Sequence, residues 1–195
     1  MRHEETNCLI VGVGGQGTVL AARVLGAAAM SAGFNVRGSE TIGMAQRGGS
    51  VTSHVRMGKD IASPLIPRRC ADVILAFEPG EALRMIEYLK PGGTLIVCDR
   101  PIVPAVKGDY DGAAAVRRLK EHDGACLVSG EDIITNCGAR SINVALIGAA
   151  AAHGAFPFGF DEIEAALAER LHEKFLAANI TALHYGAGLV TGKRL

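Results

Sequence analysis

A glycine-rich hexapeptide near the N-terminus is the feature that most constrains the fold of this chain. Gly12-Val13-Gly14-Gly15-Gln16-Gly17 lies between a short apolar run, Cys8–Val13, and an alanine- and leucine-rich stretch, Gly17–Ala32. The run is typical of a strand buried on both faces of a sheet, and the stretch is typical of a helix that Gly33 ends. A GxGxxG pattern between a strand and a helix predicts the tight turn of an α/β domain.

The glycines of this turn have different expected roles. Gly12 allows the turn to be tight, Gly14 lets the phosphate of a ligand approach the backbone, and Gly17 lets the helix pack closely against the strand. The free amides at the start of the helix then form an anion site for a nucleotide or a pyrophosphate. The alternative is the same strand-to-helix turn with no ligand.

A dinucleotide site requires one further residue at a position where this sequence lacks it. In NAD-binding folds an Asp or Glu ends the second strand and holds the ribose hydroxyls. The second strand predicted here is Phe34–Arg37, which Gly38 and Ser39 follow, and Glu40 comes late, within a loop. We therefore expect the turn to form without binding NAD or FAD.

A second glycine-rich segment, Gly38–Ser50, has no strand or helix periodicity and contains Gly43-Met44-Ala45-Gln46-Arg47-Gly48-Gly49-Ser50. A loop of this length within a compact domain tends to be functional. Arg47 offers a planar fork of donors suited to a phosphate or a carboxylate, and Gly48-Gly49 permits backbone conformations closed to other residues. The alternative is a surface loop whose arginine is solvated.

Strand-like and helix-like segments alternate along the rest of the chain. The expected strands are Val51–Met57, Asp72–Phe77, Thr94–Cys98 and Ala125–Val128. The expected helices are Glu81–Leu89, Ala113–Glu121, Ser141–Ala152, Asp161–His172 and Lys174–Tyr185. Pro91-Gly92-Gly93 ends the first of these helices, and Asp161 is the expected N-cap of the fourth. This alternation predicts a three-layer α/β/α Rossmann-like sandwich that forms one domain over residues 1–195. Because Val51–Met57 follows the second strand without a crossover helix, the mostly parallel sheet can be mixed.

Charge and hydropathy exclude several classes of protein. Twenty basic residues offset twenty acidic ones, so no electrostatic reason favours a nucleic-acid or membrane partner. No apolar stretch reaches the roughly 20 residues that span a bilayer. Met1–Asn7 is charged and leads directly into a strand, which is not the pattern of a signal peptide. We therefore expect a cytoplasmic protein.

The cysteines and histidines show no metal-ligand spacing. The five cysteines are widely separated, and none belongs to the closely spaced run that an iron–sulfur cluster needs. Cys8, Cys98 and Cys126 lie in apolar strands and are expected to be small core residues. Four histidines in strand- or helix-like segments are expected to be packed or surface side chains: His54, His153, His172 and His184. Any redox centre is therefore expected on another chain.

Taken together, the two glycine segments resemble the gamma domain of 2-oxoacid:ferredoxin oxidoreductases. GVGGQG is followed by a helix, by Ser39-Glu40 and by GMAQRGGSV, as in that family. Further matches follow in order along nearly the whole chain: Ser63-Pro64-Leu65-Ile66-Pro67, Ala71-Asp72, Phe77-Glu78-Pro79-Gly80-Glu81-Ala82, Leu89-Lys90-Pro91-Gly92-Gly93, Ser141-Ile142-Asn143, Leu146, Gly148, Lys174-Phe175, Asn179 and Gly186. Within the family, a separate chain with FEPxEAL is similar to the beta subunits of indolepyruvate oxidoreductase. Ile42 departs from the pattern, because the family often has a histidine there.

The resemblance implies a division of labour between two subunits. The large partner carries thiamine diphosphate and 4Fe–4S clusters, decarboxylates a 2-oxoacid oxidatively, passes electrons to ferredoxin and delivers the acyl group to coenzyme A. This chain binds none of those cofactors and supplies no catalytic residue. Its candidate ligand-binding or subunit-interface residues are Gly12, Gly14, Gly15, Gln16, Gly17, Gln46, Arg47, Gly48, Gly49 and Ser50. They are expected at one edge of the sheet, where they bind an anion such as the phosphates of coenzyme A or dock on the large subunit.

Two functions of other classes compete with an oxidoreductase subunit. A free-standing nucleotide- or acyl-CoA-binding regulatory protein would be stable and liganded alone, and a dehydrogenase would need the acidic ribose partner discussed above. A subunit should instead expose an apolar patch when it lacks its partner. The helix around Ala145–Ala152 and the C-terminal segment are the candidates for that patch. A homodimer is the alternative assembly when the chain is alone.

Overall fold

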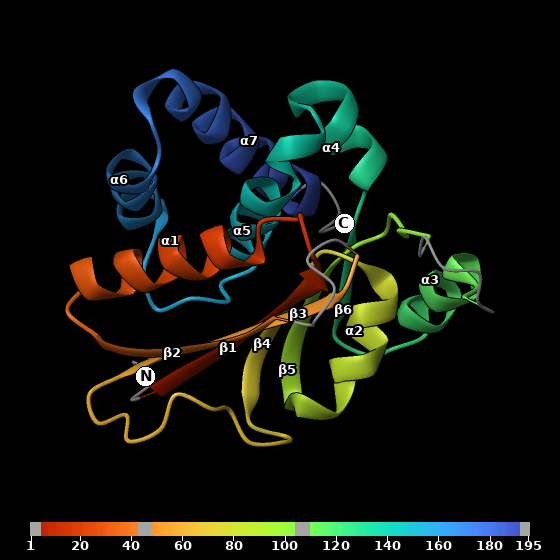
Figure 1. Ribbon diagram of the computed structural model, residues 1–195, viewed down its shortest axis with the longest axis horizontal. Coiled ribbons are helices and arrows are strands. Elements are labelled where there is room, and N and C mark those ends of the chain that lie inside the picture. The colour runs from red at the N-terminus through yellow and green to blue at the C-terminus, as the bar shows by residue number, and fades with distance from the viewer. Residues whose placement is uncertain (1–4, 43–47, 104–109, 192–195) are drawn as a thin grey trace.

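The computed structural model describes residues 5–42, 48–103 and 110–191 and folds them as a three-layer α/β/α sandwich (Figure 1). Its sheet has six strands in the order β2-β3-β1-β4-β5-β6. The strands are β1 (Glu5–Val13), β2 (Asn35–Ile42), β3 (Ser50–Gly58), β4 (Ala71–Ala76), β5 (Leu89–Cys98) and β6 (Ala125–Val128). The predicted fold class is thereby confirmed.

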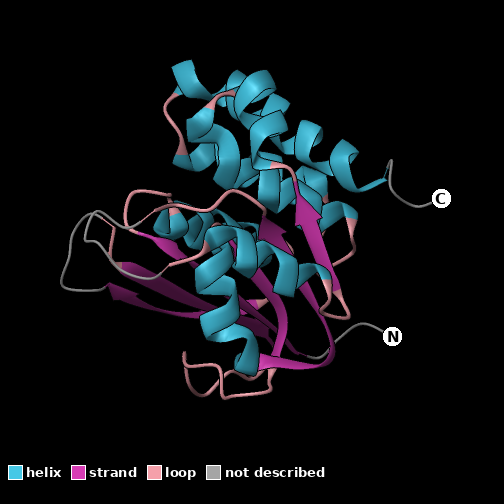
Figure 2. Cartoon of the chain, turned by 90° about the vertical axis from the view of Figure 1, so that its right-hand side faces the viewer, coloured by secondary structure: helices cyan, strands magenta, loops and turns pink. Residues whose placement is uncertain are grey.

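Helices cover both faces of the sheet. The helices are α1 (Thr18–Ser31), α2 (Pro79–Met85), α3 (Gly112–Lys120), α4 (Gly130–Cys137), α5 (Ile142–Ala152), α6 (Phe160–Arg170) and α7 (Glu173–Thr191), with the short 3-10 turns η1 (Ile86–Tyr88) and η2 (Ala139–Ser141). Figures 1 and 2 show α1, α4, α5, α6 and α7 together on one side of the strands. The smaller layer on the other side consists of α2 and α3.

Alternate residues of β1 supply the two halves of the core. Cys8 and Ile10 pack with the larger helical layer, whereas Leu9 and Val11 pack with the layer that contains α2 and α3. All four side chains are fully buried. Because successive side chains of a strand point to opposite faces, a continuously apolar strand needs a helical layer on each face.

The sheet is mixed because β2 and β3 form an antiparallel pair. β3 pairs antiparallel with both β2 and β1, whereas β4, β5 and β6 run parallel to β1. The predicted loop Gly38–Ser50 is wrong in its first part, because β2 continues to Ile42. Opposite Gly38–Ile42, residues Val51–Val55 of β3 satisfy the backbone groups. Glu40 therefore lies within a strand.

Other elements also differ from the predictions. The helix predicted to reach Leu89 ends at Met85, and the Pro91–Gly93 turn lies inside β5. The helix α4 was not predicted, although Ser129 caps it by accepting a hydrogen bond from the N–H of Asp132. The predicted helix Ser141–Ala152 begins with a 3-10 turn. Gly159, not Asp161, is the N-cap of α6, and its N–H donates to the Glu162 carboxylate.

The helix α5 lies in the core of the chain rather than on its surface. Its residues Val144–Ala150 are all buried, and α7 packs across it. A Cβ added to Gly148 would overlap the backbone of Leu183, and one added to Gly186 would overlap the backbone of Ala145. The two glycines thus allow a close helix crossing, and the predicted apolar patch on α5 is wrong because α7 covers it.

The described residues contain no single helix long and apolar enough to cross a membrane. The segments Gly130–Cys137 and Ala139–Ala152 meet those criteria of length and composition only as a pair, and the pair is bent by 118°.

Candidate functional site

The side chain of Gln16 joins the carboxyl ends of two neighbouring parallel strands. Its Oε1 accepts the N–H of Val13, at the end of β1, at 2.8 Å. Its Nε2 donates to the carbonyl of Phe77, just after β4, also at 2.8 Å. After β1 the chain crosses to β2 on one side of the sheet, whereas β4 lies on the other, so Gln16 sits at the switch point where α/β sheets commonly bind ligands.

Two of the three fingerprint glycines, Gly12 and Gly17, have roles other than those expected. Gly12 lies inside β1, where its missing side chain leaves room for Gln16; a Cβ there would stand 2.8 Å from the Gln16 Oε1. Gly17 supplies the turn, with φ +80°, and its missing Cβ makes room for Asn143 of α5. Gly15 also has a positive φ, of +101°. The sequence located the turn correctly. It did not show that Gly17 makes the turn, because the reason for a glycine there includes the contact with Asn143 of α5.

The two glycine segments lie side by side, as the sequence suggested. Gly14 donates its N–H to the carbonyl of Gly49 at 2.8 Å, and Ser50 pairs with Val13 across the β1–β3 ladder. Gly48, Gly49 and Ser50 therefore belong to the same edge as the first segment. Gln46 and Arg47 lie outside the described residues.

A pocket of about 450 Å³ opens in front of the N-terminus of α1. We call it the α1 pocket; it is lined by Gly15, Gln16, Gly17, Arg100, Ile102, Ala139, Arg140, Ile142 and Asn143. Arg100 follows β5 and Arg140 lies in η2, and neither forms an ion pair within the described part of the chain. Two guanidinium groups beside free helix amides favour an anion.

Asn143 adds a side-chain donor to the α1 pocket. The side chain is only 6% exposed, and its Oδ1 accepts the N–H of Val144 at 2.9 Å. The amide nitrogen is therefore the atom that faces Gly17, and it finds no acceptor among the residues described. This nitrogen lies at the wall of the α1 pocket, so an anion held there could accept a hydrogen bond from it.

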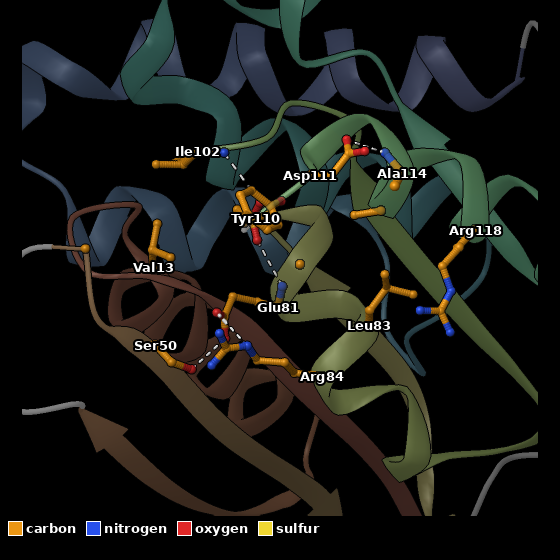
Figure 3. A pocket seen from close by; sticks show the side chains of 14 residues that line it. Val13, Ser50, Glu81, Leu83, Arg84, Ile102, Tyr110, Asp111, Ala114 and Arg118 are labelled. Carbon is orange, nitrogen blue, oxygen red and sulfur yellow. Dashed lines mark hydrogen bonds and ion pairs between the residues drawn. The ribbon is translucent and has the colours of Figure 1, made fainter. Parts of the chain in front are cut away.

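A second pocket, of about 530 Å³, is lined by residues of α2 and α3 and by Val13 and Ser50 at the same edge of the sheet (Figure 3). We call it the α2–α3 pocket; it is lined by Val13, Gly48, Ser50, Glu78, Gly80, Glu81, Leu83, Arg84, Ile102, Tyr110, Asp111, Ala114, Ala115 and Arg118. Ile102 lines both pockets. Side chains from β1, β3, α2, α3 and the segment after β5 thus meet at this edge of the sheet.

Glu78 accepts hydrogen bonds from both Ile102 and Tyr110. This residue is 3% exposed and accepts hydrogen bonds from the N–H of Glu81 at 2.9 Å, the N–H of Ile102 at 3.4 Å and the hydroxyl of Tyr110. Burial, together with the Glu78 carboxylate beside it, raises the pKa of Tyr110. The phenol therefore stays protonated near neutral pH and acts as a donor to Glu78.

The arrangement of strands does not match a dinucleotide-binding fold. In such folds the acidic residue that holds the ribose ends the strand beside β1. Here the antiparallel β3 separates β2, with Glu40, from β1. The Gln16 side chain also fills the space between the ends of β1 and β4.

The cysteines are separate thiols in different elements of the chain. Cys8 and Cys98 are buried core residues, as predicted, and Cys126 is partly buried against the core. Burial raises the pKa of the Cys8 thiol, and it raises that of Cys98 to about 11. Across the described ranges, no group of three or more His, Cys, Asp and Glu side chains could hold a metal ion.

The sequence pattern of the pyruvate ferredoxin/flavodoxin oxidoreductase family matches residues 7–189 of this chain. The chain belongs to this family. Two archaeal relatives are similar along nearly their whole length. An indolepyruvate oxidoreductase subunit IorB from Archaeoglobus fulgidus is 38% identical over 189 residues, 92% of each chain. One from Pyrococcus horikoshii is 38% identical over 191 residues, 94% of this chain and 95% of the relative. The resemblance drawn from the two glycine segments is thereby confirmed.

Solved structures of oxidoreductase subunits share the fold. The gamma subunit of a keto/oxoacid ferredoxin oxidoreductase from Geobacter sulfurreducens superposes with a TM-score of 0.70 at 21% identity, over 96% of this chain and 99% of that one. The 2-oxoglutarate:ferredoxin oxidoreductase of Magnetococcus marinus, solved with 2-oxoglutarate, coenzyme A and succinyl-CoA, gives a TM-score of 0.73 at 20% identity. The match covers 97% of this chain but 31% of that chain, so the fold also occurs as part of a longer polypeptide.

Sequence reasoning missed several side chains of this edge. Arg100 lies two residues after a predicted strand, and its position near the carboxyl end of a parallel strand could have marked it. Glu78 belongs to the family pattern, but its place directly before Pro79 also marks it as a helix N-cap, because proline favours the first position of a helix. Nothing in the sequence brings Arg140 or Asn143 to the start of α1, because α5 reaches that position only through its packing in the larger layer.

Proposed function

We propose that this chain is the small subunit of a thiamine-dependent 2-oxoacid:ferredoxin oxidoreductase that acts on indolepyruvate or a related arylpyruvate. It would form a single gamma-type domain and be inactive alone. The near full-length similarity to indolepyruvate oxidoreductase subunits supports this assignment. In the complete enzyme the 2-oxoacid is decarboxylated oxidatively, two electrons pass through iron–sulfur clusters to ferredoxin, and the acyl group is transferred to the thiol of coenzyme A.

The cofactors belong, on this proposal, to the large partner subunit. A 4Fe–4S cluster requires several thiolates converging on one point, whereas the thiols of Cys8 and Cys98 lie singly in the core. The described residues therefore do not fit a cluster, and no step of the reaction is assigned to a side chain of this subunit. Its contribution is to bind and orient.

The observation that carries the proposed role is the convergence of donors on the α1 pocket. Arg100, Arg140 and the Asn143 amide meet the first N–H groups of α1 there. Such a set suits a phosphate or pyrophosphate group, and the Magnetococcus structure contains coenzyme A, which carries both. We propose that the α1 pocket holds the phosphates of coenzyme A for the partner's active site.

The site residues inferred from the sequence take different parts in this proposal. Gly15 and Gly17 would offer backbone amides, Gly14 would tie the turn to Gly49, and Gln16 and Gly12 would fix the turn behind them. The segment that contains Gln46, Arg47, Gly48, Gly49 and Ser50 would either extend the phosphate site or contact the large subunit. Ferredoxin would bind the assembled complex, and neither nucleic acid nor a membrane is expected as a partner.

Reconstitution tests the assignment as a subunit. The chain is co-expressed anaerobically with its proposed large partner subunit, and each is purified alone and together. We expect a stable complex that reduces ferredoxin with indolepyruvate and coenzyme A, whereas neither chain does so alone. A chain that stays monomeric beside the large subunit and binds acyl-CoA by itself would instead support a regulatory protein.

Arginine substitutions separate phosphate binding from docking. In the complex, Arg100→Ala and Arg140→Ala should raise the KM for coenzyme A by about tenfold each, as expected for the loss of a charge-assisted hydrogen bond. Arg68→Ala, at the opposite end of the strands, is the matched control and should leave that KM unchanged. For Arg47→Ala, a raised KM with an intact complex would indicate phosphate binding, and loss of co-purification would indicate docking.

A further inference from the structure

The hydrogen bonding of Glu81, on the floor of the α2–α3 pocket, is incomplete. The residue is 5% exposed, and its Oε2 accepts the hydroxyl of Ser50 at 2.5 Å. Its Oε1 lies 3.6 Å from the Arg84 Nε, too far for a hydrogen bond, and accepts none from any described residue. Glu78 nearby differs, because three donors satisfy it. A buried carboxylate oxygen of this kind favours a positively charged N–H donor.

The mouth of the same pocket carries the opposite charge. The Arg84 side chain is 69% exposed and reaches back only toward Glu81, and Arg118 of α3 is exposed and forms no ion pair with a described residue. Figure 3 shows the Glu81 carboxylate between Ser50 and Arg84, with Arg118 beyond Leu83. Guanidinium groups at the mouth favour a carboxylate and repel a basic peptide. The pocket therefore has an acceptor at its floor and two arginines at its rim, where the one further carboxylate, Asp111, pairs with Arg117 at 3.7 Å.

The walls between floor and rim are apolar. Val13, Leu83, Ile102, Ala114 and Ala115 line them, and the volume of about 530 Å³ lies within the range of small-molecule sites. We propose, independently of the function above, that the α2–α3 pocket binds a free α-amino acid with an apolar side chain. Its ammonium group donates to Glu81 Oε1, its carboxylate pairs with Arg84 and Arg118, and its side chain packs against the apolar walls.

Calorimetry with half-charged analogues tests the dipolar recognition. The full chain is titrated with L-phenylalanine, with phenethylamine, which lacks the carboxylate, and with hydrocinnamate, which lacks the amine. We expect saturable binding of L-phenylalanine at one site and binding at least about tenfold weaker for each analogue, or ~1.4 kcal/mol. L-Serine, which has both charges and a polar side chain, should also bind more weakly. Absence of saturable L-phenylalanine binding, or equal affinity for phenethylamine, would overturn the proposal.

Neighbouring arginines of α3 give a matched pair of variants. Arg118→Ala should weaken L-phenylalanine binding by about tenfold. Arg117→Ala should leave it unchanged, because Arg117 is equally exposed but pairs with Asp111 at 3.7 Å and does not line the pocket. Equal losses in the two variants would contradict the proposed carboxylate contact, since they would reflect only the net charge of α3.

Two further variants test the floor and the cavity itself. Glu81→Gln keeps the shape of the side chain but removes its charge, so it should lower the affinity for L-phenylalanine while hydrocinnamate binds no worse. Should that variant fail to fold, Ala114→Leu fills the pocket from its rim and should abolish binding in a folded chain, as thermal unfolding can verify. Unchanged L-phenylalanine binding in a folded Ala114→Leu chain would place the ligand elsewhere.

Discussion

The side-chain amide nitrogen of Asn143 lies so close to Gly17 that a Cβ on that glycine would overlap it. Gly17 begins α1, and Asn143 lies in the first turn of α5, more than a hundred residues later. The contact therefore joins the start of α1 to the buried helix of the larger layer, and it places a free amide donor in the α1 pocket. The glycine serves this contact as much as it serves the turn.

Gly17→Ala should destabilise the chain more than Gly15→Ala. Both glycines have positive φ, so each alanine incurs backbone strain of about 1–3 kcal/mol. A Cβ at Gly15 meets nothing within 4 Å, whereas one at Gly17 displaces Asn143 and adds a cost of about 1–3 kcal/mol. Urea unfolding measures the difference. Equal losses of unfolding free energy would show that Asn143 moves aside freely.

Substitutions in α7 should have opposite effects two residues apart. Gly186→Ala places a methyl group against the backbone of Ala145 and should cost about 1–3 kcal/mol or more as the helices separate. At Gly188 a Cβ meets nothing within 4 Å, so Gly188→Ala should stabilise the helix by up to about 1 kcal/mol. Thermal unfolding of both variants tests this, and destabilisation by Gly188→Ala would contradict the helix orientation.

Glu78→Gln should loosen the segment that follows β5. A glutamine cannot accept all three hydrogen bonds of Glu78, so a buried donor is left unsatisfied at a cost of about 1–3 kcal/mol. Tyr110→Phe removes only one of those bonds and should cost about 1 kcal/mol. Amide hydrogen exchange at Ile102 reports the loosening. Unchanged exchange in both variants would mean that Glu78 does not hold the segment.

His54 should make stability depend on pH below about 6.5. Its Nδ1 accepts the N–H of Ile66 at 3.1 Å, and burial lowers the pKa of the imidazole. The unfolded state, whose histidine pKa is about 6.5, then binds more protons than the folded state. The contribution of His54 is complete above that pH and is lost as pH falls from about 6.5 toward the lowered folded pKa.

The measurement for His54 is a comparison of unfolding curves across pH. His54→Asn keeps an acceptor near Ile66 but cannot titrate, so the wild-type curve should fall relative to the variant between pH ~6.5 and more acidic values. Parallel curves over that range would show that the imidazole is solvated when folded.

The glycine fingerprint and the pairing of β2 with β3 show how far local sequence could predict this fold. Hydrophobic periodicity, turn residues and apolar runs located most strands, because each buried strand is a short apolar run that can be recognised from its own residues. They missed the second half of β2, since Gly38–Ile42 has little apolar character and is held by backbone bonds to β3. They also missed α4, whose eight residues are too few for a clear period.

By itself the sequence determined the α/β alternation, the strand-to-helix turn at Gly12–Gly17 and the family, because these depend on neighbouring residues or on an ordered set of motifs. Only the tertiary structure decided that Gln16 bridges β1 and β4, that α7 covers α5, and that Arg100, Arg140 and Asn143 meet at one helix end. Those contacts join residues far apart along the chain, and the packing of whole helices on the sheet sets the distances between them.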